Sequence, residues 1–447
     1  MATLADIAAI PAVRKAADRI GEYASDRMVA RVLRECHRLL SVRAEANSPA
    51  IAQQVIALLE QLTERELDGL FGGLVNEFSP DPVRVLEAAQ AYASARDANS
   101  LAALMATTEP PRQELFRRLN RAPHGTAAIV RLRRHLLGRL KKNPDWHAIE
   151  ADLLHLLSSW FNPGFLEMRR VDWNSPAHLL EQIIQHEAVH AIDGWDDLRR
   201  RLQPDRRCFA FFHPQLANVP LIFVEVALLQ EMPSAIAPLL DKRAAIGTAS
   251  KFRVAAFYSI SNCEPGLRGV NLGNFLIKRV ANELQQELPQ IKTFCTLSPM
   301  PGFLAWLHKL ASPLVTPRLK SAASHRLQGA YDALLNATRH ELASLNSLDM
   351  LGQLTQKEND ALLSLASYYL TFVTPESSGD AVARFHLDNG ARLERINLLA
   401  NPSANGLKQS AGLMVNYLYD LKRVEESHEA FVNGEVIHSR AVKSLMA

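Results

Sequence analysis

Apolar residues recur along the chain with two different periods, and the change between them divides it into regions. From Ile10 to about Trp160 the spacing is almost wholly that of amphipathic helices, interrupted by Pro and Gly. The clearest helical patterns are Val29 to Leu40, Ile51 to Leu62, Val83 to Tyr92 and Ala127 to Leu140. Asn162-Pro163-Gly164-Phe165 ends this region. We therefore predict an all-helical N-terminal domain over residues 1–165.

After residue 166, short runs rich in β-branched and aromatic residues predict strands. These runs are Arg206 to Pro214, Leu221 to Leu229, Val254 to Ile260, Ala391 to Leu398 and the segment Ser410 to Tyr419. Helical spacing returns between Pro317 and Val373, which we interpret as a helical insertion at about 315–375. The expected product is an α/β domain over residues 166–447, with the residues after Lys422 at its periphery.

A glycine-rich turn follows the run from Val254 to Ile260. Gly266-Leu267-Arg268-Gly269-Val270-Asn271-Leu272-Gly273-Asn274 leads into apolar residues that recur every fourth position from Leu272 to Leu288. Three glycines ahead of a helix let the backbone approach a ligand, and the positive end of the helix dipole favours phosphate. The turn fits neither G-x-G-x-x-G nor G-x-x-x-x-G-K-[ST]. By spacing alone it is either a pyrophosphate cradle or a turn that binds nothing.

Composition and charge are those of a soluble globular protein. Of 447 residues, 48% are hydrophobic and 22% are charged, and the formal charge of +3 is too small to suggest general nucleic-acid binding. The densest basic run, Arg131 to Lys142, fits a solvated helix face better than a phosphate or subunit contact. No run approaches about 18 apolar residues and no signal pattern opens the chain, so we expect a cytoplasmic enzyme. Four cysteines without C-x-x-C spacing are expected to be reduced core thiols: Cys36, Cys208, Cys263 and Cys295.

The segment His186-Glu187-Ala188-Val189-His190 matches the H-E-x-x-H pattern of zinc metalloproteases. Two histidines four residues apart share a helix face, and the glutamate between them can act as a general base. The further ligand that such sites need does not follow at a recognised spacing. A metalloprotease is therefore the less favoured interpretation. We expect the histidines at a helix surface or interface, and no metal.

Several sequence blocks resemble the malonyl-CoA decarboxylase family. In chain order they are Phe257 to Ser261, Gly266 to Gly273, Phe275 to Val280, Leu297 to Phe303 and Phe385 to Ala391. The glycine turn is also similar to the Arg-Gly-x-Gly-x-Gly turn of GNAT-type acyltransferases, with Asn271 in place of the middle glycine. The likeness is strongest from about Arg206 to Tyr419 and argues further against zinc. It implies a GNAT-like mixed, mostly antiparallel sheet whose splayed central strands admit a thioester arm.

The resemblance also implies roles for particular residues. Ser298 and His386 stand where the family has a catalytic serine and histidine, although the sequence alone favours a helix cap and a core histidine. We expect His386 to donate a proton, and Ser298 to orient it or to polarise the thioester carbonyl. Tyr419 is a weaker candidate for contact with the substrate carboxylate or for ordering the serine and histidine, because aromatic core packing explains it nearly as well.

Two further sets of site residues follow from the same resemblance. Family members can carry a catalytic glutamate at the position of Asn271, and an amide can neither act as a base nor carry charge at pH 7. Either the amide replaces the acid as a hydrogen-bonding group or this enzyme is slower. Because decarboxylation removes no proton, we expect the former. The residues expected to bind coenzyme A are Gly266, Arg268, Gly269, Gly273 and Asn274.

The implied activity is that of a lyase that converts malonyl-CoA to acetyl-CoA and carbon dioxide. The thioester takes up the developing charge, so no cofactor is expected beyond the coenzyme A of the substrate, and no nucleic-acid or membrane partner. Two alternatives remain: a GNAT-type acyltransferase that passes the acyl group to an amine, and a non-catalytic malonyl-CoA-binding protein. We expect homo-oligomers, because family members associate through helical regions.

Overall fold

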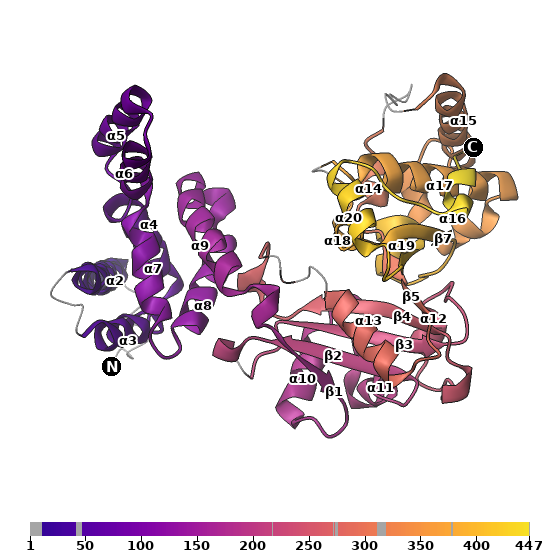
Figure 1. Cartoon of the computed structure of the whole chain (residues 1–447), viewed down its shortest axis with the longest axis horizontal. Coiled ribbons are helices and arrows are strands. Elements are labelled where there is room, and N and C mark those ends of the chain that lie inside the picture. The colour runs from indigo at the N-terminus through magenta and orange to yellow at the C-terminus, as the bar shows by residue number, and fades with distance from the viewer. Residues whose placement is uncertain are drawn as a thin grey trace. The chain divides into compact units, whose positions relative to one another are not determined.

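The computed structural model describes residues 11–41, 47–216, 218–270, 272, 276–310, 319–376 and 379–446. The chain forms two compact units (Figure 1). One unit comprises residues 1–162, 213–217 and 264–271, and the other comprises residues 163–212, 218–263 and 272–447. Two short later segments, one of which holds most of the glycine turn, therefore belong to the N-terminal unit.

The N-terminal unit is helical, as its apolar spacing predicted. Its α-helices are α2 (Pro11–Leu40), α3 (Ser48–Leu59), α4 (Glu64–Glu77), α5 (Pro82–Ala95), α6 (Ala98–Thr108), α7 (Pro111–Asn120), α8 (Gly125–Leu137) and α9 (His147–Trp160). Proline is in the first turn of α3, α5 and α7, where its missing N–H costs no hydrogen bond. Helix α4 begins with a reciprocal cap between Thr63 and Glu66. Proline and capping residues thus determine where these helices begin.

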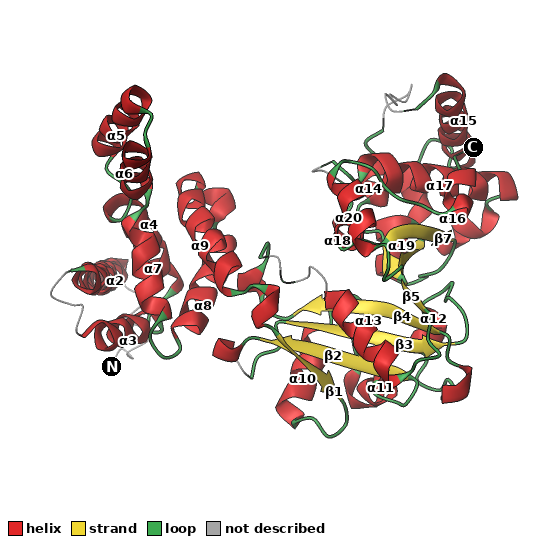
Figure 2. Cartoon of the chain, viewed as in Figure 1, coloured by secondary structure: helices red, strands yellow, loops and turns green. Residues whose placement is uncertain are grey.

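The second unit contains an eight-stranded mixed sheet in the order β1-β2-β3-β4-β5-β8-β6, with β7 also paired to β8 (Figure 2). The strands are β1 (Glu167–Val171), β2 (Arg206–Phe212), β3 (Ile222–Leu229), β4 (Val254–Asn262), β5 (Thr293–Thr296), β6 (Ser298–Pro299), β7 (Arg392–Asn397) and β8 (Met414–Tyr419). Only the β4–β5 pair is parallel among the strands of the described chain. The predicted mixed, mostly antiparallel sheet is confirmed. Strand β1 was not predicted, because it is an exposed edge strand with three charged residues.

The second unit also contains twelve α-helices among the described residues. They are α10 (Ala177–His186), α11 (Gly194–Arg201), α12 (Ala237–Leu240), α13 (Leu276–Glu287), α14 (Phe303–Leu307), α15 (Ser321–Ala337), α16 (Leu348–Gln353), α17 (Gln356–Tyr368), α18 (Ala381–Asp388), α19 (Ala404–Ser410), α20 (Val424–Val432) and α21 (Arg440–Ser444). Helices α15, α16 and α17 occupy the range interpreted as an insertion. A π-helical turn, Tyr369–Val373, continues α17.

Alternation along β2 places helices on both faces of the sheet. Cys208, Ala210 and Phe212 pack in one cluster with residues of α10 and α11. On the other face, the Arg279 guanidinium of α13 lies 5.5 Å from the centre of the Phe211 ring. Because successive side chains of a strand point to opposite faces, β2 is buried along its whole length.

The residues after Lys422 are not peripheral, contrary to the expectation from their charge. Val424 and Val442 are buried. The backbone of Leu393 in β7 exchanges hydrogen bonds with Ile437 and Ser439, each of 2.9 Å. This C-terminal segment therefore extends the packing around β7, which a charge count does not reveal.

Candidate active site

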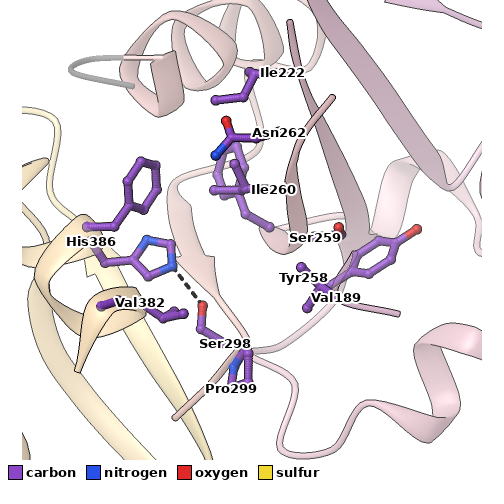
Figure 3. A pocket seen from close by; sticks show the side chains of 13 residues that line it. Val189, Ile222, Tyr258, Ser259, Ile260, Asn262, Ser298, Pro299, Val382 and His386 are labelled. Atoms are coloured by element: carbon purple, nitrogen blue, oxygen red, sulfur yellow. Dashed lines mark hydrogen bonds between the residues drawn. The ribbon is translucent and has the colours of Figure 1, made fainter. Parts of the chain in front are cut away.

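A cavity of about 310 Å³ lies in the second unit (Figure 3). It is lined by β4 from Phe257 to Ile260 and at Asn262, by both residues of β6 and by one face of α18, with Val189 and Ile222 beside them. Most of these side chains are apolar. The polar residues are Ser259, Asn262, Ser298 and His386, with the phenol-bearing Tyr258.

The cavity lies where two central strands stop pairing. Strand β4 pairs with β3 as far as Asn262, opposite Ile222, but with β5 only from Val254 to Phe257. The register between β3 and β4 shifts so that Tyr258 has no direct partner on β3. Such a bulge bends a strand and redirects its side chains. In Figure 3 the Tyr258 hydroxyl points away from Ser298 and His386.

Ser298 does not cap a helix. Helix α14 begins after Gly302, which makes no side-chain cap, and the Ser298 hydroxyl contacts other groups. Ser298 lies in the short strand β6, opposite Val415 of β8, and is buried at the cavity wall. Its Oγ lies 2.9 Å from His386 Nε2. The structure thus brings together two residues that are 88 positions apart.

His386 lies on the short helix α18, whose first turn is capped by a side chain. The Asp380 carboxylate caps α18 by accepting hydrogen bonds from the backbone N–H groups of Val382 and Ala383, each of 3.0 Å. The same carboxylate accepts a 2.8 Å hydrogen bond from the Gly302 N–H, just after β6. Asp380 therefore ties the helix that carries His386 to the loop that follows Ser298.

Tyrosines from β8 surround the imidazole. His386 Nδ1 lies 2.9 Å from the Tyr419 hydroxyl, and the Tyr417 ring stacks on the imidazole with centroids 4.8 Å apart. Burial lowers the pKa of His386 to about 3 and raises the pKa of both phenols well above their ordinary value. At neutral pH the imidazole is therefore uncharged and both tyrosines are protonated.

The glycine turn is described only in part. Gly269 is exposed and has a φ of 83°, a conformation that favours glycine, and Arg268 beside it is also exposed. Gly266 is buried, and a Cβ there would lie 2.2 Å from the carbonyl oxygen of Val130. Gly266 therefore has a packing role against α8. Asn271, Gly273 and Asn274 lie outside the described residues.

The sequence pattern did not identify one residue that positions this turn. Arg133 of α8 is 1% exposed, pairs with Glu150 and donates hydrogen bonds to the carbonyl oxygens of Gly266 and Arg268, at 2.6 and 2.7 Å. It does not belong to a solvated basic face. Its position could have been recognised from the spacing, because Arg133 lies four residues after Ile129 and therefore on the apolar face of α8.

The H-E-x-x-H segment does not form a zinc-binding helix. Helix α10 ends at His186, and Glu187 has an extended backbone, so the two histidines do not share a helix face. The buried Glu187 carboxylate accepts hydrogen bonds from the hydroxyls of Ser259 and Ser261 and from two backbone N–H groups of its own loop. His190 is buried rather than at a surface, which corrects our expectation for it. No group of three or more His, Cys, Asp or Glu side chains in the described chain could hold a metal ion.

The comparisons with known proteins cover nearly the whole chain. Residues 164–447 match the malonyl-CoA decarboxylase C-terminal domain, and residues 78–161 match the N-terminal domain of the same proteins. The chain belongs to the malonyl-CoA decarboxylase family. Mitochondrial malonyl-CoA decarboxylase from Anser anser anser is 34% identical over 85% of this chain and 79% of its own length. The Rattus norvegicus protein of the same name is 33% identical, covering 85% and 81%.

Solved structures of malonyl-CoA decarboxylases have the same fold. The protein from Rhodopseudomonas palustris is 42% identical and has a TM-score of 0.81, covering 93% of this chain and 99% of its own. The protein from Agrobacterium vitis is also 42% identical, with the same coverage and a TM-score of 0.80. The helical N-terminal region followed by a mixed-sheet domain is therefore the architecture of this family.

None of the described helices is long and apolar enough to cross a lipid bilayer.

Proposed function

We propose that this protein is a carboxy-lyase that converts malonyl-CoA to acetyl-CoA and carbon dioxide. The bond between the α-carbon and the carboxylate breaks, and its electron pair passes into a thioester enolate. Carbon dioxide leaves, His386 gives a proton to the α-carbon, and a proton from solvent restores His386. One proton is consumed in each turnover, and no oxidant, reductant or metal is needed.

The Ser298–His386 hydrogen bond at the wall of an apolar cavity is the observation that carries this proposal. The enolate carbon needs an acid, and a neutral histidine held by the serine beside it can supply one. We assign the proton transfer to His386. Ser298 orients the imidazole, because its own proton is donated to Thr296 Oγ1.

The polarity of the cavity suits the loss of carbon dioxide. None of its thirteen lining residues is Lys or Arg, so no cation in the described lining stabilises the substrate carboxylate. An apolar environment disfavours a localised carboxylate more than a delocalised enolate and neutral carbon dioxide. The cavity therefore favours the loss of carbon dioxide over retention of the substrate carboxylate.

Coenzyme A binding is assigned to the glycine turn. Exposed Gly269 and Arg268 leave the backbone accessible and provide a cation for the pyrophosphate. Gly273 and Asn274 complete the set implied by the family motif, whereas buried Gly266 supports the turn by packing against α8. Asn271 takes the place of the family's glutamate as a hydrogen-bonding group, because decarboxylation requires no base.

Self-association is assigned to the helical unit, with a second copy of the chain as the partner. Helices α5 and α6 lie side by side at one end of this unit and contain no buried residues (Figure 1). They expose Val83, Leu86, Leu101 and Met105. Apolar side chains gathered on a two-helix hairpin are typical of a surface that another protein chain covers.

Incubation of the purified protein with malonyl-CoA, a chelator and no amine tests the proposal. We expect acetyl-CoA and carbon dioxide in equal amounts, because the proposed reaction needs neither metal nor acceptor. Product that forms only when an amine is added would instead support an acyltransferase. Tight binding of malonyl-CoA without turnover would support a binding protein.

A further inference from the structure

The hydroxyl of Ser298 lies between two possible partners. Its Oγ is 2.9 Å from His386 Nε2 and 2.9 Å from Thr296 Oγ1, and Thr296 is fully buried at the end of β5. A hydroxyl has one proton to donate and two lone pairs with which to accept. If the hydroxyl donates its proton to one of these partners, it can only accept from the other.

The geometry around Thr296 determines that direction. Ser298 Oγ is the donor and Thr296 Oγ1 the acceptor in their hydrogen bond. Thr296 Oγ1 also accepts a 3.2 Å hydrogen bond from the Tyr417 N–H. Because the Ser298 proton is directed to Thr296, Ser298 Oγ can only accept from His386. The proton between these two residues then lies on Nε2.

The opposite side of the imidazole is consistent with this arrangement. A neutral imidazole with a proton on Nε2 has an acceptor at Nδ1, and burial keeps His386 neutral by lowering its pKa. The Tyr419 hydroxyl lies 2.9 Å from Nδ1 and is protonated. Tyr419 therefore donates a hydrogen bond to Nδ1, which gives its buried hydroxyl a partner.

Neighbouring strands hold Thr296 in place. The Asn416 side chain donates a 2.8 Å hydrogen bond to the Thr296 carbonyl oxygen, while its own oxygen accepts from Arg395 and Asn397. Phe257 of β4 is the register partner of Thr296. A β-branched side chain on a backbone held from two sides has little freedom at χ1. The acceptor for the Ser298 proton is thus preorganised.

We propose that Thr296 is a positioning residue that directs the Ser298 hydroxyl and thereby keeps the His386 proton on Nε2, the nitrogen that faces Ser298 at the cavity. The consequence for catalysis rests on the proposed decarboxylation, in which this proton goes to the α-carbon. The tautomer itself does not depend on turnover. The two ideas can therefore fail separately.

NMR of protein labelled with ¹⁵N-histidine tests the tautomer directly, with the His386 signals assigned by their loss in His386→Asn. We expect the Nε2–H form in the wild-type protein at pH 7. An Nδ1–H form there would overturn the proposal, and this measurement needs no variant that could fail to fold.

A Tyr419→Phe background removes the contribution of the phenol and leaves the tautomer to the Ser298 side. In this background we expect the Nε2–H form to persist, to give way to Nδ1–H when Thr296→Val is added, and to return with Thr296→Ser. Thr293→Val, on the same strand, is the matched control and should change nothing. Loss of the Nε2–H form in Tyr419→Phe alone, or its persistence with Thr296→Val, would overturn the proposal.

Kinetics supply the second readout. In the wild-type background, Thr296→Val should lower kcat about tenfold with KM nearly unchanged, the usual effect of one lost hydrogen bond. Thr296→Ser should restore most of kcat. A KM effect without a kcat effect would contradict a role in positioning the proton. An inactive wild-type protein would refute the proposed decarboxylation, while the tautomer would still decide the role of Thr296.

Discussion

At the scale of single residues, burial controls the chemistry of His386. An exposed histidine titrates near neutral pH, whereas this one stays neutral because its surroundings cannot solvate a charge. In the proposed reaction it would therefore act as a neutral acid, with Ser298 on one side and Tyr419 on the other. A strongly basic enolate carbon can take a proton from such a weak acid.

Replacing either member of the Ser298–His386 pair should lower kcat without weakening substrate binding. We expect Ser298→Ala and His386→Asn each to reduce kcat roughly a hundredfold to a thousandfold, because His386 acts on the developing charge and Ser298 holds it in place. The double variant should be scarcely slower than the worse single variant. Steady-state kinetics check this, with exposed Ser250→Ala and His325→Asn as matched controls. Full activity in a folded single variant would remove that residue from the mechanism.

His190 should make the stability of the protein depend on pH. Burial lowers its pKa to about 4 in the folded state, while the unfolded chain has the ordinary value near 6.5. The unfolded state therefore binds more protons between these values, and stability is lost as pH falls from about 6.5 to 4. His190→Gln should reduce the pH slope of the unfolding free energy by up to about 1.4 kcal/mol per pH unit. Urea unfolding of both proteins at several pH values measures this, and an equal slope in both would contradict it.

At the scale of elements, strand β8 organises the candidate site. It pairs with β5, β6 and β7, and it supplies Tyr417 and Tyr419 to His386. Alternation along a strand places both tyrosines on one face, two residues apart. Asp380, at the start of α18, adds the link between the helix of His386 and the loop after Ser298. The geometry of the pair thus depends on elements that are distant in sequence.

The glycine turn predicts a separate effect on binding. Arg268→Gln should raise KM and weaken coenzyme A binding while leaving kcat nearly unchanged, because the lost cation would contact a part of the substrate that does not react. Calorimetric titration with coenzyme A checks this, with Arg243→Gln on another exposed loop as the control. Equal affinity in the Arg268→Gln and Arg243→Gln proteins would mean that the phosphate site is elsewhere. Gly269→Val is less selective, since its positive φ makes any side chain strained.

At the scale of the whole molecule, the exposed hairpin of α5 and α6 predicts an assembly. Leu86→Glu combined with Met105→Glu should lower the mass in solution towards that of one chain, because two charges replace exposed apolar side chains. Light scattering after size-exclusion chromatography measures this mass. Leu348→Glu, at an exposed leucine of α16 in the other unit, is the control. An unchanged mass in the double variant would exclude this hairpin as the interface.

The sequence by itself determined the class of each long element and the family. Periodicity and punctuation report which face of a helix or strand is apolar and where it ends, so helices α3, α5 and α8 and strands β2, β3 and β4 were predictable. The order of the motifs was sufficient to identify candidate residues, including Ser298 and His386. Such patterns are local, and they describe each segment without its neighbours.

Only the tertiary structure decided which segments meet. The contact of His386 with Tyr419, the proton acceptor at Thr296 and the burial of Arg133 all join positions that no local pattern connects. The contact of His386 with Ser298 was expected from the family resemblance, and the structure supplies its geometry. The spacing of His190 from His186 suggested a metal site, but α10 ends at His186, so the two side chains do not share a helix face. The physical reason is that hydrogen bonding and desolvation depend on what packs against a side chain, and strand pairing over long separations determines that.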